Sequence, residues 1–174
     1  MDARELIETI TAAFPLKPVP AVGPQATHAS DALHFGRITE SEQEAAAAKD
    51  AGRTWQQYSD EELASLDAAL AHLQIDGFIY YLPAYLCAAV RYASRNVDDP
   101  WSLFVCQACF QVTNRSDYQL QRYQRLTATQ TNAVIRFLEF MVENADDHEA
   151  ERARKALDRY WTNPKRYTSS IITP

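Results

Sequence analysis

DGFIYYLPAYLCAAV, residues 76–90, is the most apolar run of the chain, and the other segments have to be placed around it. A proline lies at its centre, and three of its residues are tyrosines within six positions. Proline has no backbone N–H and is therefore tolerated in the first turn of a helix, where that group would have no partner. Apolar residues then recur at helical spacing. We predict a helix that begins at Pro83 and ends near Arg95, after a single turn over 78–82.

The composition is that of an ordinary folded domain. Of the 174 residues, 47% are hydrophobic and 23% are charged, and a chain of this length most simply forms one domain, 1–174. The net charge of −6 disfavours nucleic acids and anionic membranes as partners, because both repel an acidic surface. No apolar run approaches the ~20 residues that span a bilayer, and the acidic N-terminus is unlike a secretion signal, so we expect a cytoplasmic protein.

Capping signals and apolar spacing predict helices on both sides of the apolar run. Three pairs match the capping box, in which two side chains three residues apart satisfy backbone N–H groups: Asp2 with Glu5, Ser59 with Glu62, and Thr127 with Gln130. Apolar spacing predicts helices over 1–14, 63–73, 134–141 and 147–161. We expect Gly77 to end the second as a left-handed cap, and Asn163 and Pro164 to end the last. Segment 99–112 is also apolar, but its spacing leaves helix and strand both open.

The segment before residue 55 looks irregular. Residues 15–30 contain four prolines, so we exclude a regular helix there and expect an extended surface path, pinned by Val19 and Val22. Thr39 is a suitable cap for an alanine-rich helix that ends near Asp50, but alanine buries little area, so this helix should be peripheral.

These signals together predict a mostly α protein. We expect a single-domain helical bundle of about five or six helices with an irregular proline-rich N-terminal segment. Its parts are an N-terminal helix, an irregular peripheral segment, a helical core and a tail: 1–14, 15–54, 55–161 and 162–174.

Two clusters carry residue types that bind metals or react. Cys106 and Cys109 have the spacing of a redox pair or of half a zinc site, but a zinc site needs two more ligands. The remaining cysteine and the four histidines are scattered, so we favour two buried small residues. Segment 143–151, ENADDHEAE, groups five carboxylates and a histidine, and we interpret it as a turn whose acids favour the next helix N-terminus.

Catalytic and cofactor motifs are missing from the sequence. It contains neither G-x-S-x-G nor Ser-x-x-Lys, and its four glycines lie far apart, which argues against a phosphate-binding loop. His72 and Asp76 could form an acid–base pair, but a histidine at a helix C-terminus explains His72 more simply. We therefore predict no catalytic residue, no cofactor and no metal ligand, and we favour a non-enzymatic role.

The aromatic residues are the feature of the sequence that points most clearly to a binding role. Tryptophan and tyrosine anchor cores, but they also dominate binding hot spots. The tyrosines of the apolar run mark where we expect a pocket or a partner surface, with core packing as the alternative. The predicted binding residues are Trp55, Tyr80, Tyr81, Tyr85 and Arg91.

Segment 78–86 resembles the F-x-Y-Y-L-P-A-Y-L core of a small family of uncharacterised bacterial proteins. Members of that family also have a tryptophan before a short acidic helix, matched here by Trp55 and 59–73. An LT-x-x-Q-x-x-A-V-x-x-F-L block is matched by 126–138, and a closing A-L-x-x-Y-W by 156–161. The resemblance covers roughly residues 55 to 161. The family has no established activity, so the resemblance implies a shared fold unit and no catalytic residue.

Three functional hypotheses follow from these patterns. The first is a non-enzymatic binding module of the immunity or adaptor type, whose acids at 60–67 would steer a basic protein partner. The second is a small-molecule binder or enzyme with a tyrosine-lined pocket formed by Tyr81 and Tyr85, where Arg91 would hold an anion. The third is a structural homo-oligomer whose surplus aromatic residues form the interface.

Overall fold

The computed structural model describes residues 1–94 and 99–162, and this part of the chain contains ten α-helices and no strand. The α-helices are α1 (Ala3–Ala13), α2 (Pro24–His34), α3 (Glu40–Ala48), α4 (Asp60–Ser65), α5 (Ala69–His72), α6 (Ile75–Tyr92), α7 (Trp101–Thr113), α8 (Asp117–Tyr123), α9 (Ala128–Asn144) and α10 (Asp147–Ala156). A 3₁₀ turn, η1 (Trp55–Gln57), precedes α4, and a π-helical turn, η2 (Leu157–Trp161), continues α10. The predicted mostly α class is confirmed, but five or six helices is too few.

Helix α6 lies at the centre of the fold and runs without interruption through Pro83. The prediction that this helix begins at Pro83 is therefore wrong, because it begins two turns earlier at Ile75. An interior proline costs about 3 kcal/mol, whereas each large apolar side chain that is fully buried contributes about 1.5–3 kcal/mol. Thirteen of the 18 residues of α6 are buried, so burial outweighs the lost hydrogen bond.

The segment before α6 also differs from its prediction. The helix expected over 63–73 is divided into α4 and α5. Gly77 is not a left-handed cap, since it lies inside α6, and the only glycines with positive φ in the described residues are Gly36 and Gly52. An added Cβ at Gly77 would lie 3.1 Å from Leu73 Cδ2, so close packing favours a glycine here.

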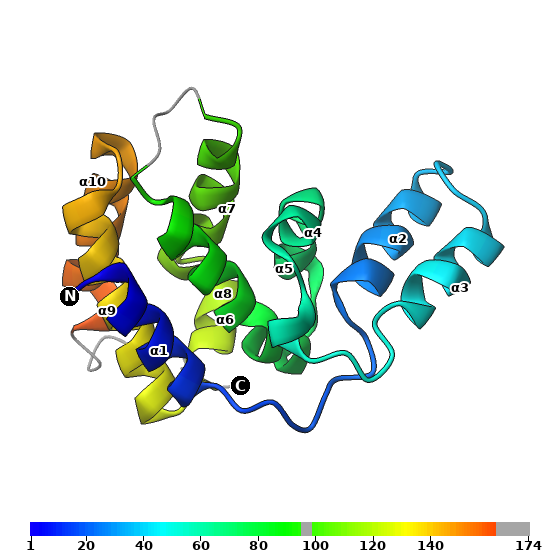
Figure 1. The fold of residues 1–174 in the computed structure, drawn as a ribbon, viewed down its shortest axis with the longest axis horizontal. Coiled ribbons are helices and arrows are strands. Elements are labelled where there is room, and N and C mark those ends of the chain that lie inside the picture. Colours follow the sequence, from blue (N-terminus) through cyan, green and yellow to red (C-terminus); the bar gives the residue numbers. More distant parts are fainter. Residues whose placement is uncertain (95–98, 163–174) are drawn as a thin grey trace, which may run out of the picture.

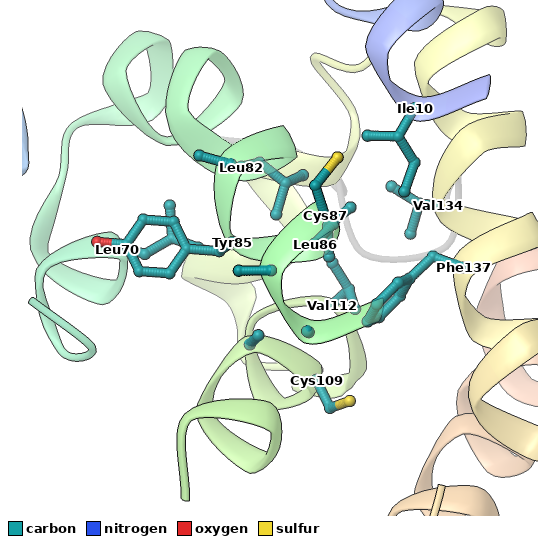
Figure 2. Packing of buried hydrophobic residues seen from close by; sticks show 14 of the residues in the cluster. Ile10, Leu70, Leu82, Tyr85, Leu86, Cys87, Cys109, Val112, Val134 and Phe137 are labelled. Atoms are coloured by element: carbon teal, nitrogen blue, oxygen red, sulfur yellow. The ribbon is translucent and has the colours of Figure 1, made fainter. Parts of the chain in front are cut away.

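The core is formed where α6 packs against α1, α7 and α9. Figure 1 shows α1 beside α9, with the hairpin of α2 and α3 at the opposite end of the long axis. Figure 2 shows side chains from these four central helices coming together: Ile10, Leu86, Val112, Val134 and Phe137, all fully buried. No helix in the described ranges is long and apolar enough to cross a membrane.

The N-terminal third is more helical than its sequence suggested. Residues 24–34 form α2, with Pro24 in its first turn, so the exclusion of helix from 15–30 was wrong for its second half. Val19 packs against the core as expected, but Val22 is 53% exposed and does not hold the segment against the core. Helix α3 buries none of its residues, which confirms that it is peripheral.

Locally encoded features form as predicted. All three capping boxes are present, and Thr39 forms a fourth with Glu42. Asp146 caps α10, which confirms the interpretation of 143–151 as a turn that favours the next helix. Segment 99–112, which was left open, is helical as α7. The expected stop at 163–164 and the rest of the tail lie outside the described residues.

Candidate functional site

The structure places the five predicted binding residues in three separate environments. Tyr81 and Tyr85 belong to the core, with exposed fractions of 0% and 1%. The hydroxyl of Tyr85 donates to the Leu66 carbonyl at 2.9 Å. Burial raises the pKa of Tyr81 to about 12 and that of Tyr85 further. Neither of the two is among the residues that line the cavities described below.

Trp55 and Arg91 share a cavity of about 230 Å³, which we call the α1–α6 cavity. Its lining comes from α1, η1, α4 and α6: Ile7, Thr11, Trp55, Gln56, Tyr58, Leu63, Ala84, Cys87 and Arg91. The guanidinium of Arg91 makes a two-pronged ion pair with the Asp60 carboxylate, with 2.8 Å between Nε and Oδ2. The Asp60 carboxylate thus balances the positive charge of Arg91. Desolvation raises the pKa of the Cys87 thiol to about 11, so this cysteine is protonated at neutral pH.

Tyr80 lines a different cavity of about 300 Å³, which we call the proline cavity. The wall comes from the segment after α1, the first turns of α6 and the start of α9: Phe14, Pro15, Lys17, Pro18, Val19, Pro20, Asp76, Ile79, Tyr80 and Gln130. The Tyr80 hydroxyl donates to the Leu16 carbonyl at 2.7 Å, which ties the proline segment to α6. Tyr80 is thus the predicted residue that joins a cavity wall to the core.

The proline cavity is apolar inside and carries three polar groups. Its lining includes three prolines together with aliphatic and aromatic side chains. Lys17 and Asp76 are exposed charges of opposite sign, and Gln130 is buried. The Gln130 side-chain oxygen accepts from the Thr127 N–H at 3.0 Å as part of the capping box of α9. An apolar pocket with a few placed polar groups is the usual form of a binding site.

Asp50 organises the region between the hairpin and the core, although nothing in the sequence singled it out. It is 3% exposed, and its carboxylate accepts from the Ala26 N–H at 2.8 Å and the Gln25 N–H at 3.3 Å, at the N-terminus of α2. It also accepts from the Tyr58 hydroxyl at 2.5 Å. An added Cβ at Gly23 would lie 2.6 Å from Asp50 Cγ, so the carboxylate occupies the space that a larger residue would need.

Arg122 is a second buried polar residue that the sequence did not single out. It has no exposed surface, and it donates to the Ala71 carbonyl at 2.9 Å, to the Leu73 carbonyl and to the Gln119 side chain at 2.8 Å. Its guanidinium also lies over the Phe78 ring, 4.5 Å from the centroid. Desolvation lowers the pKa of Arg122. The carbonyls at the end of α5, together with this ring, stabilise its charge.

The cysteine pair and the acidic segment 143–151 are both engaged in contacts within the fold. Cys109 is fully buried, and desolvation raises its thiol pKa well above the usual value. Cys106 is partly exposed, and its Sγ accepts from Arg152 Nη1 at 3.4 Å. Arg152 also pairs with the buried Glu149 carboxylate at 3.1 Å. Across 1–94 and 99–162, no group of three or more histidine, cysteine or acidic residues could hold a metal ion.

Comparison with known proteins identifies the family of the chain and nothing more specific. Among curated proteins and among solved structures, the chain finds no match. A family model, described as a family of unknown function (DUF6714), matches residues 2–165. This range is wider than the 55–161 over which the sequence resembles a family of uncharacterised proteins, because it includes α1 and the α2–α3 hairpin. The chain belongs to the family of unknown function DUF6714.

Proposed function

We propose that this protein is a non-enzymatic binding module whose proline cavity takes one apolar side chain of a partner protein. The observation that carries the proposal is the wall of the cavity, in which Pro15, Pro18 and Pro20 and Ile79 of α6 line the same space. A cavity of about 300 Å³ lies at the small end of binding pockets and suits one side chain better than a large cofactor.

The walls of the proline cavity are rigid before any ligand arrives. Each proline ring fixes its own φ angle, so the segment loses little conformational entropy on binding. The hydrogen bond from Tyr80 to the Leu16 carbonyl fixes the same segment to a buried helix. Preorganisation of this kind supports affinity in a small contact, where the buried area alone gives little.

The polar groups of the cavity suit a peptide. Lys17 can donate to a backbone carbonyl, and Asp76 can accept from a backbone N–H. These two opposite charges give the cavity no net preference for an anion or a cation. A neutral apolar side chain flanked by peptide groups therefore fits the lining better than a charged metabolite.

The charge of the whole protein favours a basic partner. The net charge of −6 speeds the encounter with a cation by electrostatic steering. Two of the acids at 60–67 are already paired, Asp60 with Arg91 and Glu62 with Arg53. Steering therefore comes from the protein as a whole more than from this cluster, and an immunity or adaptor role would use it in the same way.

Titration with capped amino acids, followed by ¹⁵N NMR, tests the proline cavity. The probes are the N-acetyl amides of tryptophan, leucine and proline, with that of serine as the polar control. At about −0.3 kcal/mol per non-hydrogen atom, a probe of roughly 15 such atoms binds with about −4.5 kcal/mol, near a millimolar dissociation constant. We expect the apolar probes to shift the amide signals of Lys17, Val19 and Tyr80, and the serine probe to leave them unchanged.

A pair of matched variants distinguishes binding in the proline cavity from non-specific binding to apolar surface. Ile79→Phe fills the proline cavity and should abolish the shifts. Ile135→Phe makes the same change in another cavity, of about 470 Å³, bounded by α8, α9 and η2, and should leave them intact. The proposal fails if no apolar probe shifts these signals up to its solubility limit, or if Ile79→Phe binds as the wild type does.

A second candidate function is a small-molecule site in the α1–α6 cavity. The observation that favours it is the buried indole N–H of Trp55, which has no hydrogen-bond partner within the described residues. A ligand with an acceptor oxygen would satisfy this donor. We expect acetate, isobutyrate or benzoate to shift the Trp55 indole N–H signal, and a signal that moves with none of the three excludes the candidate.

A further inference from the structure

A further cavity, of about 580 Å³, joins the α2–α3 hairpin to the segment where α5 ends and α6 begins, and we call it the hairpin groove. Four of its polar residues recur at helical spacing, so they lie on one face of α2: Thr27, Ser30, Asp31 and His34. Gln43 of α3, His72 of α5 and Gln74 before α6 also line it. This lining offers many hydrogen-bonding side chains, so the groove suits a polar group better than an apolar one.

The charge around the hairpin groove is negative. Residues 24–48, which form the hairpin, contain four acidic residues and one arginine, a net charge of −3 in a chain of net charge −6 with histidine counted as neutral. Among the described lining residues, Asp31 is the only acid and none is lysine or arginine. Asp31 also makes no ion pair within 1–94 and 99–162. Its place in the last turn of α2 is unfavourable for a carboxylate, because the helix dipole is negative there, so a cation would be stabilised by both.

The hairpin groove and the proline cavity are neighbours along two segments of the chain. Pro20 and Asp76 line the proline cavity, and Val22 and Gln74, each two residues away, line the hairpin groove. The two segments lie against each other, since an added Cβ at Gly77 would be 3.6 Å from the Val22 carbonyl oxygen. Two residues of extended chain span about 7 Å, so a short peptide can reach from one cavity to the other.

We infer that the hairpin groove binds an arginine side chain of the same partner segment whose apolar side chain occupies the proline cavity, an inference that rests on the proposed function for its second contact. A guanidinium has five N–H donors in a planar fork and pairs with a carboxylate through two of them. Asp31 supplies the carboxylate, and the side-chain oxygens of Ser30 and Gln43 are further acceptors in the lining. A lysine ammonium has fewer donors and no fork, so it matches this set less well. The basic partner therefore carries an arginine a few positions from an apolar residue.

Titration of the ¹⁵N-labelled full chain with N-acetyl-arginine amide tests the hairpin groove by itself. A probe of about 15 non-hydrogen atoms binds with a dissociation constant near millimolar. We expect it to shift the amide signals of Ser30, His34 and Gln74. N-acetyl-citrulline amide, which has nearly the same shape without the charge, should leave them unchanged. The inference is overturned if the arginine probe shifts none of these signals, or if free arginine binds at least tenfold more tightly than the capped probe, which would assign the groove to a metabolite.

Two variants separate a local contact from the attraction of the whole acidic chain. Asp31→Asn removes the carboxylate of the groove and should weaken binding of the arginine probe at least fivefold. Glu143→Gln makes the same change in net charge at an exposed position of α9 and should change binding less than twofold. Equal effects of the two variants mean that net charge attracts the probe, and they refute a site at the groove.

Linked peptides test whether one partner segment fills both cavities. The probes are acetylated peptide amides with a leucine and an arginine separated by one to four glycines, in both orders. At least one of them should bind about tenfold more tightly than either capped amino acid, because the second contact becomes intramolecular. Ile79→Phe and Asp31→Asn should each remove this gain, and a series without any gain overturns the shared segment.

The two sets of probes keep this inference and the proposed function apart. If the capped apolar amino acids shift the signals of the proline cavity while the arginine probe shifts nothing, the inference alone fails. If the arginine probe binds while the apolar probes shift nothing, the proposed function fails, and the shared partner segment fails with it.

Discussion

Removal of the Asp50 carboxylate should destabilise the protein by about 3 kcal/mol. The carboxylate caps α2 through the N–H groups of Gln25 and Ala26, and loss of such a cap costs about 1 kcal/mol. It also accepts from the buried Tyr58 hydroxyl, and a buried hydroxyl left without its acceptor costs about 1–3 kcal/mol. In Asp50→Ala these two losses add, because one side chain makes both contacts.

Urea unfolding at neutral pH, followed by circular dichroism, measures this loss. With a slope of about 2 kcal/mol per M, a loss of 3 kcal/mol lowers the midpoint by about 1.5 M. Asp31→Ala is the matched control, since it removes the same charge from an exposed position of α2 and should change stability by less than about 0.5 kcal/mol. Hydrogen exchange of the α2 amides shows whether the hairpin opens alone before the core unfolds.

A double-mutant cycle isolates the contact between Asp50 and Tyr58. Tyr58→Phe removes the hydroxyl but leaves the cap of α2, so it should cost less than Asp50→Ala. The double variant should be more stable than the sum of the two losses predicts, by about 1–2 kcal/mol. The reasoning is refuted if the two changes are additive, or if Asp50→Ala is as stable as Asp31→Ala.

Three further predictions concern buried groups. Gly23→Ala should cost about 1–3 kcal/mol in urea unfolding, because its Cβ would lie 2.6 Å from Asp50 Cγ. Arg122→Met should cost about 3 kcal/mol, since it leaves buried carbonyls unpaired, while the exposed Arg125→Met should cost less than about 0.5 kcal/mol. The third is a loss of stability at alkaline pH. The pKa of Tyr81 is about 12 in the folded protein and about 10 in the unfolded chain. The contribution of this shift to the free energy of unfolding is therefore complete below about pH 10 and is lost as the pH rises towards 12. Urea midpoints of Tyr81→Phe should therefore fall less steeply than those of the wild type between pH 9 and 11.5, and equal slopes contradict the shift.

The cavities could not be predicted from the sequence, because each one joins segments that are distant along the chain. The proline cavity combines residues near 15–20 with Asp76 and Gln130, and the α1–α6 cavity combines Thr11 with Arg91. A sequence pattern marks aromatic residues as good anchors without showing which of them reach the surface. Of the three tyrosines in the apolar run, one lines a cavity and two are enclosed in the core.

Local signals, by contrast, were sufficient for much of the secondary structure. The capping boxes and the apolar spacing of α1, α9 and α10 depend on residues three or four positions apart. All the residues that make these interactions therefore lie within one segment of the sequence. The same holds for the weak burial of α3, which follows from its alanines.

Long-range packing changed the expectation wherever it opposed a local preference. Pro83 would begin a helix if only its neighbours mattered, but burial of α6 on several sides keeps the helix continuous through it. The prolines before α2 suggested an extended path, yet the remote carboxylate of Asp50 caps a helix there. In both places many tertiary contacts, each worth a few kcal/mol or less, together outweigh a local cost of similar size.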